Sequence, residues 1–160
     1  MTMRTLSFLA ALAVVALTAC GDNVSSTTGT GTPPIMVAGL WTYSIDLSGS
    51  MHASCQASGI TRLNQTTASN TFTGSAQGGT QICTSDAGTD GDQPLFLNFT
   101  NGEITGLAIR FLSQACVYVG AASPPMNDLV NDLAGTATCV IVLPQGGGNP
   151  TMTGTWHLSR

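Results

Sequence analysis

The side chains that could do acid–base or nucleophilic chemistry are few in this 160-residue chain. His52 and His157 are its two histidines, and Glu103 is its single glutamate. None belongs to a pattern such as HExxH, GxSxG or a phosphate-binding glycine loop, and no two carboxyl groups stand out as an acid–base pair. Secreted hydrolases combine at least a nucleophile with a base in reach. We therefore expect a protein that is not an enzyme, with no catalytic residue and no cofactor.

One acidic cluster has the chemistry of a cation site. Asp86, Asp90 and Asp92 occur in the segment SDAGTDGD, and hard oxygen ligands between glycine-containing turns suit Ca²⁺. The spacing differs from that of an EF-hand, and the glutamate that closes such a loop is missing. A solvated turn is the simpler explanation, so we expect no metal and keep the three aspartates as the candidate ligands.

The first of the five cysteines, Cys20, follows a short apolar run. Arg4 precedes the run, which covers residues 6–17 and is too short to span about 30 Å of hydrocarbon but suits a signal peptide. It ends in Leu17-Thr18-Ala19-Cys20, which resembles a bacterial lipobox. The resemblance implies cleavage before Cys20, diacylglyceryl transfer to its thiol and acylation of the new amino group with chains such as palmitate. The alternative is an ordinary secretory signal with an incidental cysteine.

These features predict three parts: a lipoprotein signal peptide over 1–19, a lipid-anchored flexible linker over 20–36, and one domain over 37–160. Several acyl chains make an effectively permanent membrane anchor. Gly21, where aspartate would favour retention, points by analogy to the outer membrane of the cell envelope. Inner against outer membrane, and the periplasmic against the surface face, stay open.

The other four cysteines are predicted to form disulfides, because an exported protein folds in an oxidising space. Cys55, Cys83, Cys116 and Cys139 contain no CxxC pair, which argues against a zinc or redox site. Three connectivities are possible. We favour Cys55–Cys83 and Cys116–Cys139, since each would join neighbouring strands of a meander.

The amino-acid composition limits the classes of partner that the protein can bind. Charged residues make up 8% of the chain, the net charge is −4, and there is no basic cluster. Nucleic-acid binding needs a basic footprint, so we exclude it. The expected partner is the membrane, through the lipid anchor, whereas a protein, glycan or small-molecule partner stays open.

Alternation of apolar and polar residues predicts strands. In the segment 40–47, Trp41, Tyr43, Ile45 and Leu47 share one face. The segment 151–160 repeats the pattern, and further strands are expected at 59–65, 71–77, 95–99, 103–112, 115–119 and 135–143. Asn101-Gly102 predicts a hairpin turn, and the glycines 146–148 predict the last turn. Ser123, Pro124 and the spacing of Met126, Leu129, Val130 and Leu133 allow a helix of at most two turns.

A short repeat, apolar-(Thr/Ala)-Gly-x-(Trp/Ala), recurs around Gly39, Gly74, Gly106, Gly135 and Gly154. Glycine inside a strand marks a bend, a bulge or a close backbone approach, so the repeat predicts the coiling that closes a barrel. We expect a small antiparallel meander barrel of about eight strands, with a β-sandwich as the alternative.

The opening Gly39-Leu40-Trp41, the segment Phe72-Thr73-Gly74-Ser75 and the closing Gly154-Thr155-Trp156 are similar to short meander barrels of the calycin type, such as avidin-like and lipocalin-like proteins. The chain also resembles small uncharacterised bacterial lipoproteins. The calycin resemblance implies that Trp41 plugs one end of the barrel. The polar ligand contacts of avidins have no counterpart in this sequence.

Two functions are therefore predicted. The first is a non-catalytic structural or interaction domain of the envelope. The alternative is a binding module for a small apolar or amphipathic ligand, whose interior is lined by Trp41, Tyr43, Phe72, Phe99, Tyr118 and Trp156. In the first case these six side chains fill the core, because an eight-stranded barrel is just wide enough for side chains to fill.

Overall fold

The computed structural model describes residues 35–89, 92–95, 97–125, 129–142 and 148–160. These residues belong to one compact unit and consist of strands and their connections. The predicted signal peptide, the predicted linker up to residue 34, Asp90, Met126 and residues 143–147, on which part of the predicted last turn falls, lie outside the described residues. Among the residues that are described, no helix is long and apolar enough to cross a membrane.

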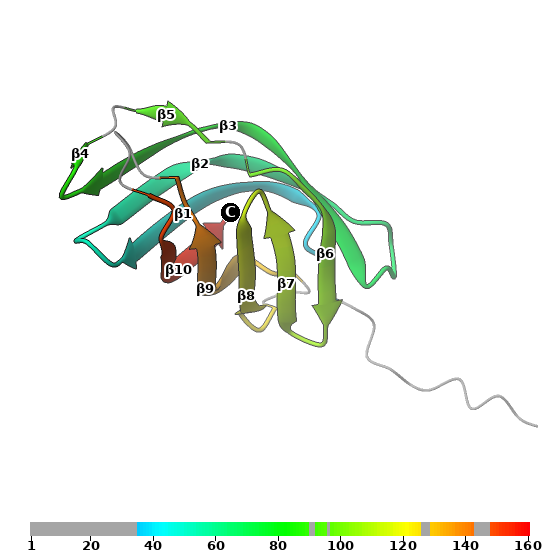
Figure 1. Cartoon of the computed structure of the whole chain (residues 1–160). Helices are drawn as coiled ribbons and strands as arrows, with labels where there is room; N and C mark the ends of the chain where they lie inside the picture. Colours follow the sequence, from blue (N-terminus) through cyan, green and yellow to red (C-terminus); the bar gives the residue numbers. More distant parts are fainter. Residues whose placement is uncertain (1–34, 90–91, 96, 126–128, 143–147) are drawn as a thin grey trace, which may run out of the picture. The chain divides into compact units, whose positions relative to one another are not determined.

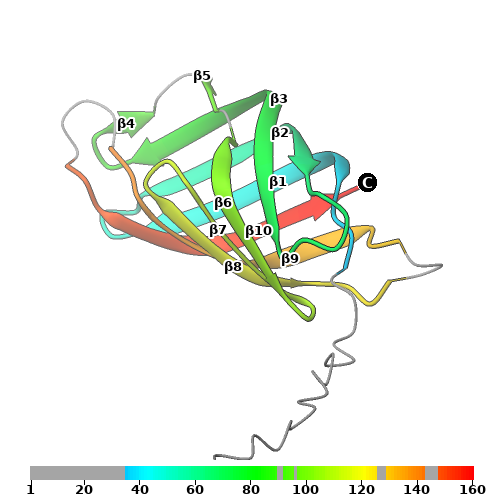
Figure 2. The ribbon, with the colours of Figure 1, turned by 90° about the vertical axis from the view of Figure 1, so that its right-hand side faces the viewer.

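Eight strands close into an antiparallel meander barrel, in which each strand pairs with the next along the chain and the last pairs with the first (Figures 1 and 2). The strands are β1 (Gly39–Gly49), β2 (Ser54–Asn64), β3 (Thr71–Ser85), β6 (Phe99–Thr105), β7 (Ala108–Ser113), β8 (Cys116–Ala122), β9 (Asp132–Val140) and β10 (Thr151–Ser159). Two short strands, β4 (Gly88–Thr89) and β5 (Gln93–Pro94), pair with the far part of β3. The predicted all-β barrel is confirmed.

The alternation in the sequence matches the burial of the strands. Every second residue of β1, from Trp41 to Leu47, points into the barrel and is at most 6% exposed. In β10 the inward positions include Met152, Trp156 and Leu158, each at most 2% exposed. Because strand side chains alternate between two faces, this register places the threonines and serines between them on the outer wall.

The predicted hairpin at Asn101-Gly102 is wrong. Both residues lie inside β6, and the chain turns at Gly106 and Leu107, where Thr105 pairs with Ala108. Gly106 has a φ of +62°, which suits a turn. Gly102 serves packing instead, since a Cβ there would lie 2.6 Å from the ring of Phe72.

The predicted helix after Ser123 is also wrong in the part that is described. Leu129 forms an isolated bridge, Val130 is irregular, and Leu133 lies in β9 with no exposed surface. Val130 enters the core from the connection before β9, and Leu133 enters it from β9 itself. Their three-residue separation therefore resembles the spacing of a helix without indicating one. Burial in the barrel outweighs the local helical preference.

The repeated glycines support closure at four of their five positions. At Gly74 the ring of Phe99 covers the backbone, and at Gly154 an added Cβ would lie 1.8 Å from the carbonyl oxygen of Asp46. Gly135 packs against the backbone of β8, and Gly39 has a φ of +144° beside Arg160. Gly106 is the exception, because it lies in a turn. Glycine is needed where backbone or aromatic rings approach a coiled strand this closely.

The two ends of the barrel differ in strand pairing. The Trp41 end is where β1 begins and β10 ends, and the disulfide end is where β2, β8 and β10 begin. β6 pairs with β3 only between Thr71 and Gly74, so the rest of β3 has no β6 partner. The described residues on either side of position 96, Gln93–Leu95 and Leu97–Asn98, cover this gap at the disulfide end: Leu95 N donates to the Gly79 carbonyl, and Asn98 Oδ1 accepts from Ala76 N.

Candidate functional site

The six aromatic residues predicted to line a ligand site all lie inside the barrel, each 1–5% exposed. Phe99 stacks on Phe111 with ring centroids 4.4 Å apart, and Phe111 stacks on Tyr118 at 4.5 Å. Phe72 and Trp156 meet Phe111 edge-on at 6.2 and 5.3 Å. The rings therefore fill the middle of the barrel by packing on each other.

Phe111 is the centre of this cluster and was missed by the sequence analysis. It contacts the rings of four other aromatic residues and is 1% exposed. The signal was available, because Ile109, Phe111 and Ser113 have the period-two spacing of a half-buried strand. The incorrect prediction of a turn at Asn101-Gly102 hid this pattern. It joined the second half of β6 and most of β7 into one expected strand over 103–112.

At the disulfide end the interior leaves a cavity of about 20 Å³. Ile45, Leu47, Leu95 and Tyr118 form apolar parts of its wall, and Gln81 and Gln114 add amide groups. A volume of this size holds about one water molecule. The Tyr43 hydroxyl holds one of these wall residues in place, because it donates to the Leu95 carbonyl at 3.1 Å.

The Trp41 end is closed by side chains that fasten the incoming chain. The indole Nε1 of Trp41 donates to the Val37 carbonyl at 2.8 Å, and the Arg160 guanidinium lies 4.5 Å from the indole ring centre. Arg160 also donates to the carbonyls of Val130 at 2.7 Å and Ala38 at 2.6 Å. These contacts join the first and last strands around one ring.

Gln65 holds the same incoming segment from the other side. Its Oε1 accepts from Val37 N at 2.7 Å, and its Nε2 donates to the carbonyls of Ile35 at 3.0 Å and Ser69 at 2.8 Å. An amide that makes three bonds of this kind fixes the backbone on either side of it. The segment that leads into β1 is therefore tied to the β2–β3 connection.

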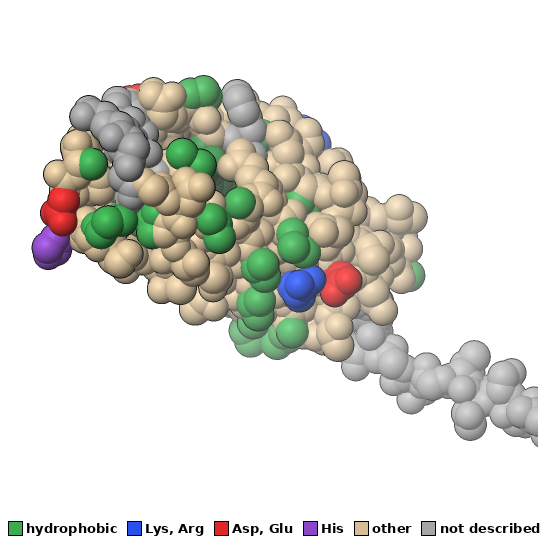
Figure 3. Space-filling model, viewed as in Figure 1, with side chains coloured by type: hydrophobic (Ala, Val, Ile, Leu, Met, Phe, Trp, Pro, Cys, Tyr) green, Lys and Arg blue, Asp and Glu red, His purple; other side chains and the backbone are tan. Residues whose placement is uncertain are grey.

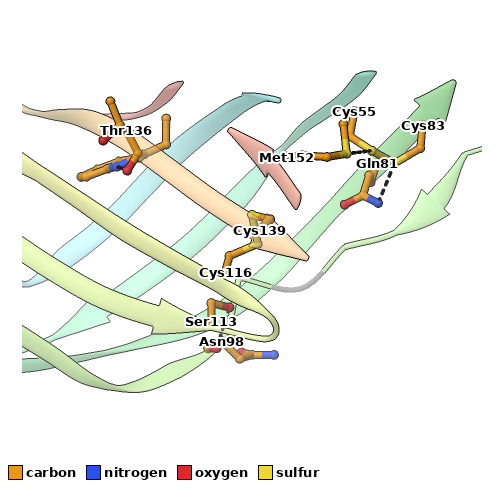
Figure 4. The surroundings of a disulfide bond; sticks show 10 residues. Cys55, Gln81, Cys83, Asn98, Ser113, Cys116, Thr136, Cys139 and Met152 are labelled. Atoms are coloured by element: carbon orange, nitrogen blue, oxygen red, sulfur yellow. Dashed lines mark hydrogen bonds between the residues drawn. A yellow bond between two sulfur atoms is a disulfide. The ribbon is translucent and has the colours of Figure 1, made fainter. Parts of the chain in front are cut away.

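The structure has the two disulfides that the predicted meander favoured, Cys55–Cys83 and Cys116–Cys139 (Figure 4). Each joins directly opposite residues of neighbouring strands, β2 with β3 and β8 with β9. All four half-cystines are 1–7% exposed. Met152 Sδ lies 3.8 Å from Cys55 Sγ, and Gln81 Nε2 donates to Cys83 Sγ at 3.1 Å.

The two histidines lie at opposite ends of the barrel, each beside an aspartate. His52 Nδ1 is 3.0 Å from Asp86 Oδ1, and His157 Nε2 is 3.0 Å from Asp132 Oδ1. Asp86 thus has a histidine partner, while Asp90 lies outside the described residues. In the described part of the chain, no three histidine, cysteine, aspartate or glutamate side chains come together as a metal would require.

Burial shifts the ionisation of both tyrosines. Desolvation raises the pKa of Tyr43 above 10.0. The pKa of Tyr118 is raised further by burial and, second, by the nearby charge that Tyr43 would carry when ionised. Both phenols are therefore neutral at physiological pH, and they act as packing groups with a polar tip.

The outer wall of the barrel divides into two surfaces. Over β9, β10, β1, β2 and β3 the outward positions are mainly hydroxyl and amide side chains. This hydroxyl wall has shallow grooves of about 310 and 320 Å³, one at Asn64, Thr71 and Thr100 and one at Ser44, Gln56 and Thr80. Over β7 and β8 the outward positions are mostly aliphatic, and hydrophobic surface gathers on this side of the molecule (Figure 3).

Comparisons of the sequence with protein-family models and with curated proteins, and of the structure with solved structures, find no match.

Proposed function

We propose that this protein is a lipid-anchored, non-catalytic domain of the bacterial cell envelope that acts through its outer surface. In this proposal the signal peptide is removed before Cys20, the acylated Cys20 holds the chain in the outer membrane, and the linker presents a calycin-like barrel. The barrel serves as a rigid body, and its hydroxyl wall meets protein or glycan partners.

The observation that carries this proposal is the filled interior. Phe72, Phe99, Phe111, Tyr118 and Trp156 occupy the space that a ligand would need. Drug-sized ligands occupy pockets of roughly 300–1,000 Å³, whereas the cavity beside Tyr118 measures about 20 Å³. This difference favours a structural or interaction role over the alternative of a small-ligand carrier.

The buried polar groups support the same interpretation. The Thr61 hydroxyl donates to the Leu97 carbonyl at 3.2 Å, and the Ser113 hydroxyl donates to the Asn98 carbonyl at 2.8 Å. Both bonds fasten the segment that covers the gap beside β3. Polar atoms inside the barrel thus serve closure, and a buried hydroxyl with a partner gains little from a ligand.

The anchor is tested with the full chain and its Cys20→Ser variant expressed in a Gram-negative bacterium. We expect the unchanged chain in the membrane fraction, with a mass that shows cleavage before Cys20 and added acyl chains. The variant should be released from the membrane or should keep its leader. A chain that fractionates with the membrane without acylation would contradict the proposed anchor.

The role is tested by crosslinking in intact cells and by titration of the purified protein with envelope lipid extract. Reproducible protein or glycan neighbours, with unchanged tryptophan emission and thermal midpoint in the titration, are expected. Trp41 and Trp156 lie inside the barrel, so a ligand that entered it would change their emission. A saturable change in tryptophan emission together with a raised thermal midpoint would contradict the structural role and favour the binding module.

A further inference from the structure

The outer face of β7 and β8 is more uniformly aliphatic than the outer face of β1, β2 and β3, where Leu40, Ile60 and Ile82 are exposed among hydroxyl and amide side chains. Between them the two strands and their flanks expose a continuous aliphatic surface, called here the apolar wall, formed by Leu107, Leu112, Val117, Val119, Ala121 and Val140. Val119 is 49% exposed, Val140 50% and Leu107 39%. Isolated exposed aliphatic residues are ordinary, but contiguous ones mark a surface that binds something apolar.

The strand register shows that these side chains are neighbours. Leu112 pairs with Val117 across β7 and β8, and Ala108 pairs with Ala121. Val140 follows on β9, where its amide donates to the Ala115 carbonyl beside the start of β8. By contrast, Thr151, Thr153 and Thr155 occupy the outward positions of β10. The change from a hydroxyl strand to an aliphatic strand takes place across β9.

The apolar wall carries one charged side chain at its centre. Arg110 is the charged residue of β7 and β8, and it pairs in register with Val119 on one side and with Glu103 of β6 on the other. The opposite wall carries charges of both signs, since Asp46 of β1 and Arg62 of β2 point outward. An arginine can lie along a bilayer surface with its stem on apolar groups and its head in the interface.

We propose that the apolar wall lies against the surface of the lipid bilayer in which Cys20 is anchored. This inference rests on the proposed lipid anchor. About 15 residues separate Cys20 from Ile35, and a chain of that length reaches at most about 50 Å in any conformation. A barrel held so close meets the bilayer at a high effective concentration, so a weak apolar contact is enough to orient it.

The chemistry of the wall fits lipid better than a protein partner. Stable protein interfaces depend on buried anchors, most often tryptophan, tyrosine and arginine. Both tryptophans and both tyrosines of this chain lie inside the barrel, and the wall consists of small aliphatic side chains around one arginine. Surface adsorption to lipid scales with apolar area and needs no matching pocket.

The test uses the full, acylated chain reconstituted into vesicles of phosphatidylethanolamine and phosphatidylglycerol whose acyl chains carry bromine near the headgroup. One variant is Val119→Trp. The matched control is Gln56→Trp, because Val119 pairs with Thr136, Thr136 with Thr155, Thr155 with Asp46, and Asp46 with Gln56. The two positions therefore lie in one row, four strands apart in an eight-stranded barrel.

Bromine quenches only rings that reach the lipid, so the emission of the added tryptophan, after the emission of the unchanged chain with its buried Trp41 and Trp156 is subtracted, should fall at least about twofold more in Val119→Trp than in Gln56→Trp. Ala121→Trp is a second wall position, used if the first variant alters the thermal midpoint. Equal quenching of wall and control positions would overturn the inference. A second outcome would also overturn the inference. If bromine does not quench the wall tryptophan, but its emission shifts to the blue as more protein is added per vesicle, the wall binds a second copy of the chain.

Failure of the anchor and failure of this inference give different results. If mass spectrometry shows no acyl chain on Cys20, the proposed function fails before any vesicle is made. If the acylated chain enters the vesicles and its wall and control positions are quenched alike, only the orientation is wrong.

Discussion

At the Trp41 end of the barrel, a tryptophan, an arginine and a glutamine fasten the chain by packing and hydrogen bonds, whereas at the other end two disulfides do comparable work. The difference follows from strand pairing. At the Trp41 end all eight strands have both neighbours, but beyond Gly74 β3 loses β6 and pairs with the two-residue strands β4 and β5. Cys55–Cys83 ties β3 to β2, and Cys116–Cys139 ties β8 to β9. Covalent bonds thus hold the end where the ladder of hydrogen bonds is incomplete.

The largest effect should come from removing the ring that closes the Trp41 end. Trp41→Ala leaves a large hole under Arg160 and should lower the free energy of unfolding by about 3–5 kcal/mol. Urea unfolding followed by the emission of Trp156 measures it. Trp41→Phe keeps most of the ring and should cost clearly less. A loss below about 1 kcal/mol for Trp41→Ala would mean that this end is not held by packing.

Removing either disulfide should cost slightly less. The pairs Cys55→Ala with Cys83→Ala, and Cys116→Ala with Cys139→Ala, open loops with sequence separations of 28 and 23 residues. In the chain-entropy model each loss is about 3–4 kcal/mol. Hydrogen exchange sharpens the comparison: amides of β3 beyond Gly74 should exchange faster in the first double variant, while those around Trp41 stay protected. Uniform acceleration over the whole barrel would show that the two ends are not separately stabilised.

Much of the architecture follows from the sequence, because period-two patterns in β1 and β10 leave little choice about which side chains enter the core. The disulfide pairing followed from the meander order. The errors have one cause. Gly102 and the apolar residues from Leu129 to Leu133 have local patterns that suggest a turn and a helix, but contacts from distant strands decide their structure. Arg160 gave no local signal, since its role depends on Trp41, which is far away in the sequence.

The two buried tyrosines should make the free energy of unfolding decrease with pH in the alkaline range. Each phenol has a pKa above 10.0 in the folded protein but an ordinary pKa in the unfolded chain. The contribution of the tyrosines to the free energy of unfolding is therefore complete below about pH 10. It is lost as the pH rises toward the pKa values of the folded protein. The free energy of unfolding should fall by up to about 1.4 kcal/mol per pH unit for each tyrosine. Urea titrations between about pH 8 and pH 11 measure it.

Near-ultraviolet absorbance gives an independent check, because tyrosinate should appear together with unfolding and not before. Tyr118→Phe should flatten the dependence. Tyrosinate that forms in the folded protein near pH 10 would show that the aromatic cluster admits water.

The smallest effect concerns Arg160, whose guanidinium is exposed on one side. Arg160→Ala removes the bonds to Val130 and Ala38 and the contact with the Trp41 ring, yet water can replace part of them. We expect a loss of about 1 kcal/mol. Arg160→Lys keeps a charge but not the planar group that meets two carbonyls at once, so it should recover only part of that loss. The loss of stability from either Arg160 substitution should not be additive with the loss from Trp41→Ala, because all three changes affect the same cluster. Strict additivity in this double-mutant comparison, measured by urea unfolding, would separate Arg160 from the closure of the Trp41 end and leave that closure to Trp41 and Gln65.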